Sequence, residues 1–318
     1  MKKVILFFLL SIAGFSVTSL APIDTVEING TSKDMVLNGD DLVIATDMGH
    51  IEIYDTVKKM KIKEIAIPDV KDFMGDMIPA RVMSTDVMNG TYLLLSDSGK
   101  GGYANLYLHK DNKTELLIDH TAKKPVIKAR FIDETHILLG YLGNEVSLYD
   151  IKSKKEVYRV QLSESKFSDF AVNEERSQAV FSCESGILSV VDIQSGKVLK
   201  ELEGQNVDNV YKVDFKGGKV SAAGQDRRGA LYDAKSGKGS YIEGEFLIYA
   251  TALSPSTKKV AFAMDEKNNI SVYNTSSKSK IALLKGQKST LNVIIFKDEN
   301  VLFSASDDNT IMVWDLKK

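Results

Sequence analysis

One hairpin pattern recurs along the chain and constrains its fold more than any other feature of the sequence. At the C-terminus, Leu302, Ser304 and Ser306 alternate with Phe303 and Ala305 before the turn Asp307-Asp308-Asn309. The alternation resumes after the turn, over residues 311–315. Such alternation around residues that tolerate unusual backbone angles indicates two antiparallel strands joined by a tight turn. Six earlier segments repeat this pattern, and the equivalent final residues are Asp55, Lys110, Asp150, Asp192, Asp233, Asn274 and Asp315. They are spaced by 55, 40, 42, 41, 41 and 41 residues.

Each repeat also has room for two further strands. An apolar stretch precedes the hairpins, as in residues 127–131 and 291–296, and another stretch follows after turns such as Ser195-Gly-Lys. A period near 41 residues matches the four-stranded blade of a β-propeller, which takes about 40–45 residues. The five prolines lie between the predicted strands, where a missing N–H does no harm. The sequence therefore predicts an all-β, seven-bladed propeller built as a single domain.

The two ends of the chain are predicted to close the ring. The last repeat stops at Lys318, just after its third strand, so its blade lacks an outer strand. Residues 25–28 alternate like a strand and belong to no other repeat. We expect them to pair with residues 311–314, which would complete the last blade and cover an exposed strand edge.

The terminal run Ser-Ala-Ser-Asp-Asp-Asn-Thr-Ile-Met-Val-Trp-Asp resembles the end of a WD40 repeat. The resemblance extends over residues 24–318 and implies a WD40-like seven-bladed propeller. The other repeats depart from the family pattern, because tyrosine replaces its tryptophan at Tyr54, Tyr149, Tyr232 and Tyr273. The Gly-His pair of the family reads Gly-Gln at residues 204–205 and 286–287. Without those histidines, the buried His–Asp–Ser–Trp network of the family is expected to be incomplete in every blade.

The N-terminus has the features of a secretory signal peptide. A basic start, Met1-Lys-Lys, precedes an apolar run at residues 4–17 and small residues at 18–21. The run is shorter than the roughly 20 residues that span a membrane. We predict that residues 1–21 are cleaved after Ser19 or Ala21, and that the domain of residues 22–318 is periplasmic without stable membrane insertion. An uncleaved membrane anchor is the alternative.

Composition excludes several classes of function. Without Lys2 and Lys3, 39 basic residues remain against 43 acidic ones, a net charge of −4 that gives no sign of nucleic-acid binding. Cys183 is the only cysteine, so no disulfide framework is expected. Residues 50, 109, 120 and 136 are histidines without the spacing of a metal site, and we expect structural or surface roles for them. No metal, cofactor or catalytic residue is predicted.

The second repeat carries the strongest candidate for an interaction site. Its excess of about 14 residues falls in the segment 68–79, and the turn at residues 96–105 is also enlarged. Alternating strand direction places both segments on one face of the propeller. Loops on rigid scaffolds commonly carry function, and these two supply the protein-interaction candidates Phe73, Met74, Met77 and Tyr103. In the alternative interpretation, the loop packs its apolar side chains onto its own blade.

Charged turns supply a second set of interaction candidates. Arg227 and Arg228 lie in the hairpin turn of the fifth repeat, and Asp307 lies in that of the last repeat. At the central opening, these arginines could hold a carboxylate of a protein partner. The alternative is that both turns are simply solvated.

The exported, degenerate repeats also resemble the accessory propellers encoded with periplasmic nitrate reductases, the NapL type. This resemblance implies a non-catalytic protein-interaction scaffold that supports the maturation or electron supply of such an enzyme. Its partner would then belong to a periplasmic respiratory enzyme complex. A different hypothesis is a propeller enzyme, lactonase or quinoprotein-like, with its site in the central channel. The predicted inner strands offer only isolated polar candidates for such a site, including Asp208 and Asn292.

Overall fold

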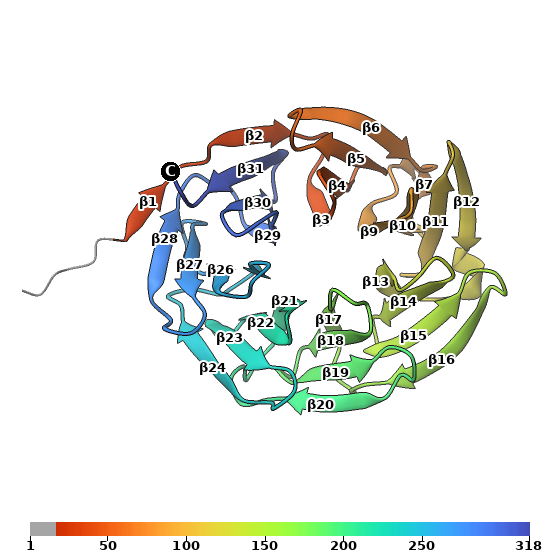
Figure 1. The fold of residues 1–318 in the computed structure, drawn as a ribbon. Coiled ribbons are helices and arrows are strands. Elements are labelled where there is room, and N and C mark those ends of the chain that lie inside the picture. The colour runs from red at the N-terminus through yellow and green to blue at the C-terminus, as the bar shows by residue number, and fades with distance from the viewer. Residues whose placement is uncertain (1–16) are drawn as a thin grey trace, which may run out of the picture.

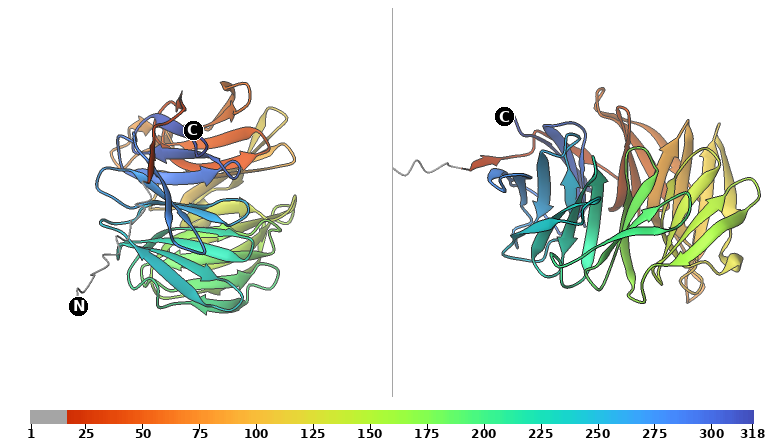
Figure 2. Two further views of the ribbon diagram at one scale, coloured as in Figure 1. Left: turned by 60° about the vertical axis from the view of Figure 1, so that its left-hand side comes forward. Right: turned by 60° about the horizontal axis from the view of Figure 1, so that its bottom comes forward.

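The computed structural model describes residues 17–318, which form seven antiparallel blades around a central axis (Figure 1). Four strands follow one another from the axis to the rim in each blade, and a fifth strand is added at the rim of blade six. Seen from the side, the blades form a disc whose connections emerge on its two faces (Figure 2). The predicted all-β, seven-bladed propeller is therefore confirmed.

The first four blades follow the chain in order from the axis outward. Blade one contains β3 (Ser32–Asn38), β4 (Asp41–Thr46), β5 (His50–Asp55) and β6 (Met60–Ala66). Blade two contains β9 (Val82–Met88), β10 (Thr91–Asp97), β11 (Ala104–Lys110) and β12 (Lys113–Ile118). Blade three contains β13 (Val126–Phe131), β14 (His136–Tyr141), β15 (Glu145–Asp150) and β16 (Lys155–Gln161). Blade four contains β17 (Phe167–Val172), β18 (Gln178–Cys183), β19 (Leu188–Asp192) and β20 (Val198–Leu202).

The last three blades include the two strands from the N-terminal segment. Blade five contains β21 (Val210–Lys216), β22 (Lys219–Gly224), β23 (Arg228–Asp233) and β24 (Gly239–Glu243). Blade six contains β25 (Thr251–Leu253), β26 (Lys259–Ala263), β27 (Ile270–Asn274), β28 (Lys280–Leu284) and, at its rim, β1 (Thr18–Leu20). Blade seven contains β29 (Leu291–Phe296), β30 (Val301–Ser306), β31 (Thr310–Asp315) and β2 (Asp24–Glu27). Between blades one and two lie β7 (Val70–Lys71) and β8 (Met77–Ile78), and η1 (His120–Ala122) precedes blade three.

The position of a strand in its blade explains its pattern of side chains. The second strand of a blade is covered on both faces by the two adjacent blades. Residues 42–45 and 93–95 are therefore continuous apolar runs with almost no exposure. The outer strand β16 instead alternates between exposed and half-buried residues, because only one of its faces meets the next blade. Apolar burial between adjacent blades is thus the main source of stability for the ring.

Strand β2 closes the ring as predicted. It pairs antiparallel with β31, with Val26 opposite Ile311, and the N–H of Ile28 donates to the Asn309 carbonyl at 2.9 Å. Val26 and Ile28 are buried in a core cluster that also contains Phe303 of blade seven and residues of blade one. Strand β2 therefore joins the last blade to the first.

The N-terminal strand β1 adds a fifth strand to blade six. It pairs in parallel with β28, and Leu20 packs against the apolar core of that blade. The predicted signal peptide lies mostly outside the described residues, and its cleavage after Ser19 or Ala21 stays a prediction. Cleavage at Ala21 would remove β1 and leave blade six with the same four strands as its neighbours. Within residues 17–318, no helix is long and apolar enough to cross a membrane.

A glutamine replaces the missing histidine in the last blade. The indole N–H of Trp314 donates to Ser304 Oγ at 2.8 Å, and this hydroxyl donates to Gln287 Oε1 at 2.7 Å. Gln287 Nε2 donates to Ser306 Oγ at 2.6 Å, and that hydroxyl donates to Asp308 Oδ2 at 2.9 Å. The family histidine is absent, as the sequence shows, yet the buried hydrogen bonds from tryptophan to aspartate are continuous. An amide can replace the imidazole because it offers both a donor and an acceptor.

Candidate functional site

The extra segment before blade two is a short hairpin of two paired strands. Strands β7 and β8 pair with Val70 opposite Ile78, and Val70 is buried in the core between blades one and two. At the tip, the N–H of Asp72 donates to the Asp76 carbonyl at 2.9 Å, and the Asp72 carboxylate accepts the Asp76 N–H at 2.9 Å. The hairpin is thus held by its own hydrogen bonds and by one apolar anchor.

The hairpin presents apolar side chains to solvent instead of packing them. Phe73 is 99% exposed, Met74 is 79% exposed and Met77 is 59% exposed. Only Tyr103, on the neighbouring β10–β11 turn, is half-buried. An isolated exposed apolar residue is ordinary, but several of them on one projecting hairpin form a surface feature that partner binding would explain.

The two enlarged segments of blade two touch each other. A Cβ atom on Gly99 of the β10–β11 turn would lie 2.2 Å from the Lys71 carbonyl oxygen, so only glycine permits this approach of the two backbones. Gly99 also has a φ of +65°, a conformation that suits glycine. Within the turn, Ser98 Oγ donates to the Tyr103 carbonyl at 2.6 Å. The two segments therefore form one surface, on which Phe73 and Tyr103 line a common pocket, while Met74 and Met77 lie on the same hairpin as Phe73.

This surface, which we call the blade-two surface, includes an open pocket of about 470 Å³. Its lining comes from the hairpin, the β10–β11 turn and the η1 segment, and consists of Asp72, Phe73, Gly99, Lys100, Gly101, Tyr103, His120, Thr121 and Lys123. The segment is fixed to the blade because the His120 N–H donates to Asn105 Oδ1 at 2.9 Å. Two aromatic rings and two lysines thus border a hollow that suits an apolar side chain flanked by carboxylates.

The charged-turn candidates do not join the blade-two surface. Blade five lies across the ring from blade two (Figure 1). Arg228 is held within its own blade, because Nη1 donates to the Gln205 carbonyl at 3.1 Å and the guanidinium stacks on the Tyr241 ring. Arg227 is exposed at the tip of its turn. Asp307 accepts a hydrogen bond from Asn292 Nδ2 at 2.9 Å.

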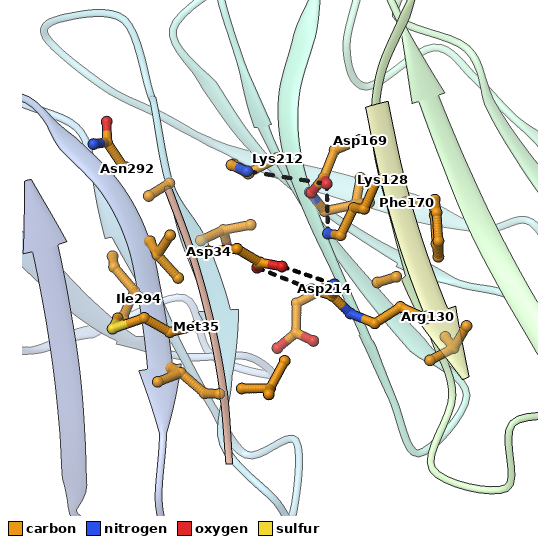
Figure 3. Close-up of a pocket in the computed structure, with 18 of the residues that line it drawn as sticks. Asp34, Met35, Lys128, Arg130, Asp169, Phe170, Lys212, Asp214, Asn292 and Ile294 are labelled. Atoms are coloured by element: carbon orange, nitrogen blue, oxygen red, sulfur yellow. Dashed lines mark hydrogen bonds and ion pairs between the residues drawn. The ribbon is translucent and has the colours of Figure 1, made fainter. Parts of the chain in front are cut away.

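The central channel contains a cluster of charged side chains on the innermost strands of blades one, three, four and five (Figure 3). They line a cavity of about 200 Å³ together with apolar residues and Asn292, and they are Asp34, Lys128, Arg130, Asp169, Lys212, Asp214 and Lys216. A β-bulge precedes the charged residue on the innermost strand in each of these blades. A bulge changes the direction of the side chains that follow it. This explains why the charged side chains of these largely apolar strands face the central axis.

The channel charges are paired with one another. Arg130 binds Asp34 with two hydrogen bonds of 2.7 and 2.9 Å, and both side chains are nearly buried. Burial disfavours the charged form of Asp34, but the attraction of Arg130 and Lys128 outweighs this effect and lowers the pKa of the carboxyl. Lys128 donates to Asp169 at 2.6 Å, although burial lowers the pKa of this amine. The geometry is that of a structural ion-pair network.

The channel aspartates also bind the backbone of the next blade. Asp34 Oδ2 accepts the Thr85 N–H at 3.0 Å, which joins blade one to blade two. Equivalent bonds run from Phe131 to Asp86 at 2.9 Å, from Val213 to Asp169 at 3.1 Å and from Leu253 to Asp214 at 2.7 Å. These carboxylates satisfy backbone N–H groups that the inner edges of the blades would otherwise leave unpaired.

Sequence reasoning missed the channel cluster. Of the two inner-strand candidates named from the sequence, Asn292 lines the channel cavity and Asp208 does not, and the charged residues of the cluster were not among them. A signal was present, because Lys128, Arg130 and Asp169 interrupt strands that are otherwise apolar. An unpaired charge in such a position would be costly, so each should have been expected to have a partner. The identity of each partner depends on how blades distant in sequence meet.

Comparisons with known proteins include a distant similarity to a curated protein. No family model matches the chain. A curated protein, the guanine nucleotide-binding protein subunit beta-like protein of Encephalitozoon cuniculi (strain GB-M1), is 27% identical over 184 residues. The match covers 54% of this chain and 53% of that protein, so the chain spans about half the length of the curated relative it matches. With its seven blades and its terminal Trp-Asp hairpin, the molecule is a WD40-like seven-bladed propeller.

Proposed function

We propose that this propeller is a non-catalytic scaffold for protein–protein interaction and that the blade-two surface binds its partner. The observation that carries the proposal is the near-complete exposure of Phe73 and Met74 on a hairpin that is itself hydrogen-bonded and anchored. A preorganised apolar group loses little conformational freedom on binding, so it favours association. Binding would remove the exposed phenyl ring from water, which is the usual role of an aromatic anchor at an interface.

The lysines beside the pocket indicate the chemistry of the partner. Lys100 and Lys123 border the hollow that Phe73 and Tyr103 form. A complementary protein surface would offer an apolar side chain for the hollow and carboxylates for the two ammonium groups. Such charges at the rim mainly steer association and select partners, whereas the buried apolar contact contributes most of the affinity.

We further propose that the scaffold acts in the periplasm as an accessory factor for the maturation or electron supply of a periplasmic nitrate reductase. The signal-peptide pattern of residues 1–21 supports the compartment. The resemblance to the NapL-type propellers supports the choice of enzyme, which would supply the acidic and apolar partner surface. A channel enzyme is the less favoured function, because the channel carboxylates are already engaged by lysine, arginine and backbone N–H groups.

The test is a crosslinking capture of partners with a double variant, Phe73→Ser with Met74→Ser. Both side chains are exposed, so the two substitutions are expected to leave the thermal unfolding temperature unchanged. We expect the wild type to capture a defined protein and the double variant to lose at least about 90% of it, which corresponds to roughly 1.4 kcal/mol of binding free energy.

A matched control replaces exposed apolar residues elsewhere on the disc. Met60 and Ile62 on β6 are 53% and 46% exposed, so Met60→Ser with Ile62→Ser also removes exposed apolar side chains, although with less exposed area than Phe73 and Met74. This control should capture the partner as the wild type does. Equal capture by the Phe73 and Met74 variant would contradict the blade-two surface. A captured nitrate reductase subunit would support the finer proposal, and a partner from another system would overturn that part alone.

A further inference from the structure

We propose that blade one carries a binding site for a zinc-type divalent metal ion, formed by His50, Glu52 and Glu64. The side chains come from the adjacent strands β5 and β6, and one ligand atom from each lies within 4.8 Å of the other two. His50 and Glu52 are buried, whereas Glu64 is exposed and gives access from solvent. This site is separate from the blade-two surface and from the channel cluster.

Strand geometry brings the three side chains together. His50 and Glu52 are two residues apart on β5 and therefore point to the same side of the sheet. Glu64 of β6 lies directly opposite Glu52 in the register of the two strands. His50 Nε2 and Glu52 Oε1 are 3.2 Å apart. Tetrahedral coordination with bonds of about 2.0–2.1 Å places neighbouring ligand atoms roughly 3.3 Å apart, so this pair already has the required separation.

The hydrogen bonds of His50 require a proton or a metal ion between Nε2 and the Glu52 carboxylate. Its Nδ1 lies 3.0 Å from the Met48 carbonyl oxygen, which can only accept, so Nδ1 carries a hydrogen. In a neutral ring, Nε2 then directs a lone pair at the Glu52 carboxylate. Either a proton or a metal ion must separate these two acceptors. An N–H donated to a carbonyl is also the usual way in which a metal-binding histidine is oriented.

The ligand set indicates which metal would bind. Imidazole nitrogen and carboxylate oxygen suit zinc and the neighbouring transition metals, whereas magnesium and calcium prefer sites formed by oxygen atoms alone. Three protein ligands leave a fourth position for water in a tetrahedral site. We therefore expect zinc to bind and magnesium not to compete with it.

Lys61 currently supplies positive charge to the site. Its Nζ lies 3.0 Å from Glu64 Oε2 and 3.6 Å from Glu52 Oε2, and its side chain is about half exposed. A metal ion would displace this flexible amine into solvent. Removing the amine should therefore strengthen metal binding.

The site is attached to the closure of the ring. The N–H of Asn29, in the segment between β2 and β3, donates to Glu52 Oε1 at 2.9 Å. A metal ion would fix Glu52 and with it the segment that leads from blade seven to blade one. Since a ligand that binds only the folded state stabilises it, zinc should raise the thermal unfolding temperature.

The experiment titrates tag-free, chelator-treated full-length protein with zinc chloride at pH 7.5 by calorimetry, with metal content measured by mass spectrometry. We expect one zinc ion per chain and an increase in unfolding temperature. His50→Gln should abolish binding, Glu64→Gln should weaken it by about tenfold or more, and Lys61→Met should strengthen it. Cobalt should give the intense visible absorption of a tetrahedral complex in the wild type and in Lys61→Met, but not in His50→Gln.

The controls keep the proposal open to refutation. His109→Gln changes a buried histidine on β11 of blade two and should leave zinc binding unchanged. Glu64→Gln alters an exposed side chain, so its effect does not depend on the folding of the His50 variant. Absence of zinc binding in the wild type would overturn the proposal, because a proton would then separate His50 from Glu52. Equal zinc binding in the wild type and the Glu64 variant would also overturn it, because the bound zinc would not use Glu64. Equal binding of magnesium would overturn the assignment of metal class.

Discussion

At the scale of residues, the most consequential feature is the buried ion pair of Asp34 and Arg130. These side chains belong to blades one and three, 96 residues apart, and they meet across the innermost strand of blade two. Asp34 also accepts the Thr85 N–H, so one carboxylate serves three blades. Removing either partner would leave the other charge buried and unpaired, which strongly destabilises a protein. Replacing both partners with apolar residues usually changes the stability much less.

We therefore predict that Asp34→Ala lowers the free energy of unfolding by about 3–5 kcal/mol. The double variant Asp34→Leu with Arg130→Met should lose much less, because it leaves no uncompensated charge. Urea unfolding followed by tryptophan fluorescence measures both, since Trp314 is fully buried. The control Lys59→Ala breaks the exposed pair with Asp24 and should cost less than about 1 kcal/mol. A loss for Asp34→Ala no larger than that of the control would contradict the prediction.

At the scale of elements, strand β2 determines whether the ring is closed. Val26 of β2 and Ile28, the first residue after it, enter the core, while Glu27 between them stays exposed. Because β2 is an edge strand, only alternate N–H groups face β31, and that of Ile28 binds the Asn309 carbonyl. A proline in this strand is therefore harmful or tolerated according to its position.

The substitution Ile28→Pro should destabilise the protein by about 3 kcal/mol, because it removes both a ring-closing hydrogen bond and a buried side chain. The matched substitution Glu27→Pro, whose N–H faces away from β31, should cost less than half as much. Thermal unfolding by circular dichroism gives both values, and limited proteolysis reports whether residues 17–28 detach first. Equal effects of the two prolines would show that β2 does not hold the ring.

Elements were predictable from the sequence where their signal is local. Period-two alternation identified the hairpins, and the incomplete last repeat required a strand that only residues 25–28 could supply. The pairing of β1 with β28 was not predictable, because three residues carry little pattern and their sequence also fits the end of a signal peptide. The length of the segment 68–79 located the hairpin, but the contact of Gly99 with Lys71 depends on how two loops meet in space.

At the scale of the whole molecule, polar bonds as well as apolar packing join the blades to one another. Hydrogen bonds from backbone N–H groups to Asp34, Asp86, Asp169 and Asp214 join blades one to two, two to three, four to five and five to six. Lys128 and Asp169 join blades three and four. The remaining two interfaces also have polar contacts beside their apolar clusters. Lys259 Nζ donates to the Glu299 carbonyl at 2.6 Å between blades six and seven, and Lys297 pairs with Asp40 at 2.9 Å between blades seven and one. Charged and polar side chains thus join the blades all round the ring.

The stability of the ring should depend on pH through Asp34. Its pKa is lowered in the folded protein, so its contribution is complete above its ordinary pKa of about 3.9 and is lost as the pH falls through the lower folded value. Urea midpoints of the wild type and of the Asp34→Leu, Arg130→Met double variant should differ by a constant amount from pH 7 to pH 5. Below about pH 4, the wild type should lose stability more steeply, because only it has a carboxylate to protonate at this position. Parallel curves down to pH 3 would show that the pair of Asp34 and Arg130 contributes nothing to acid sensitivity.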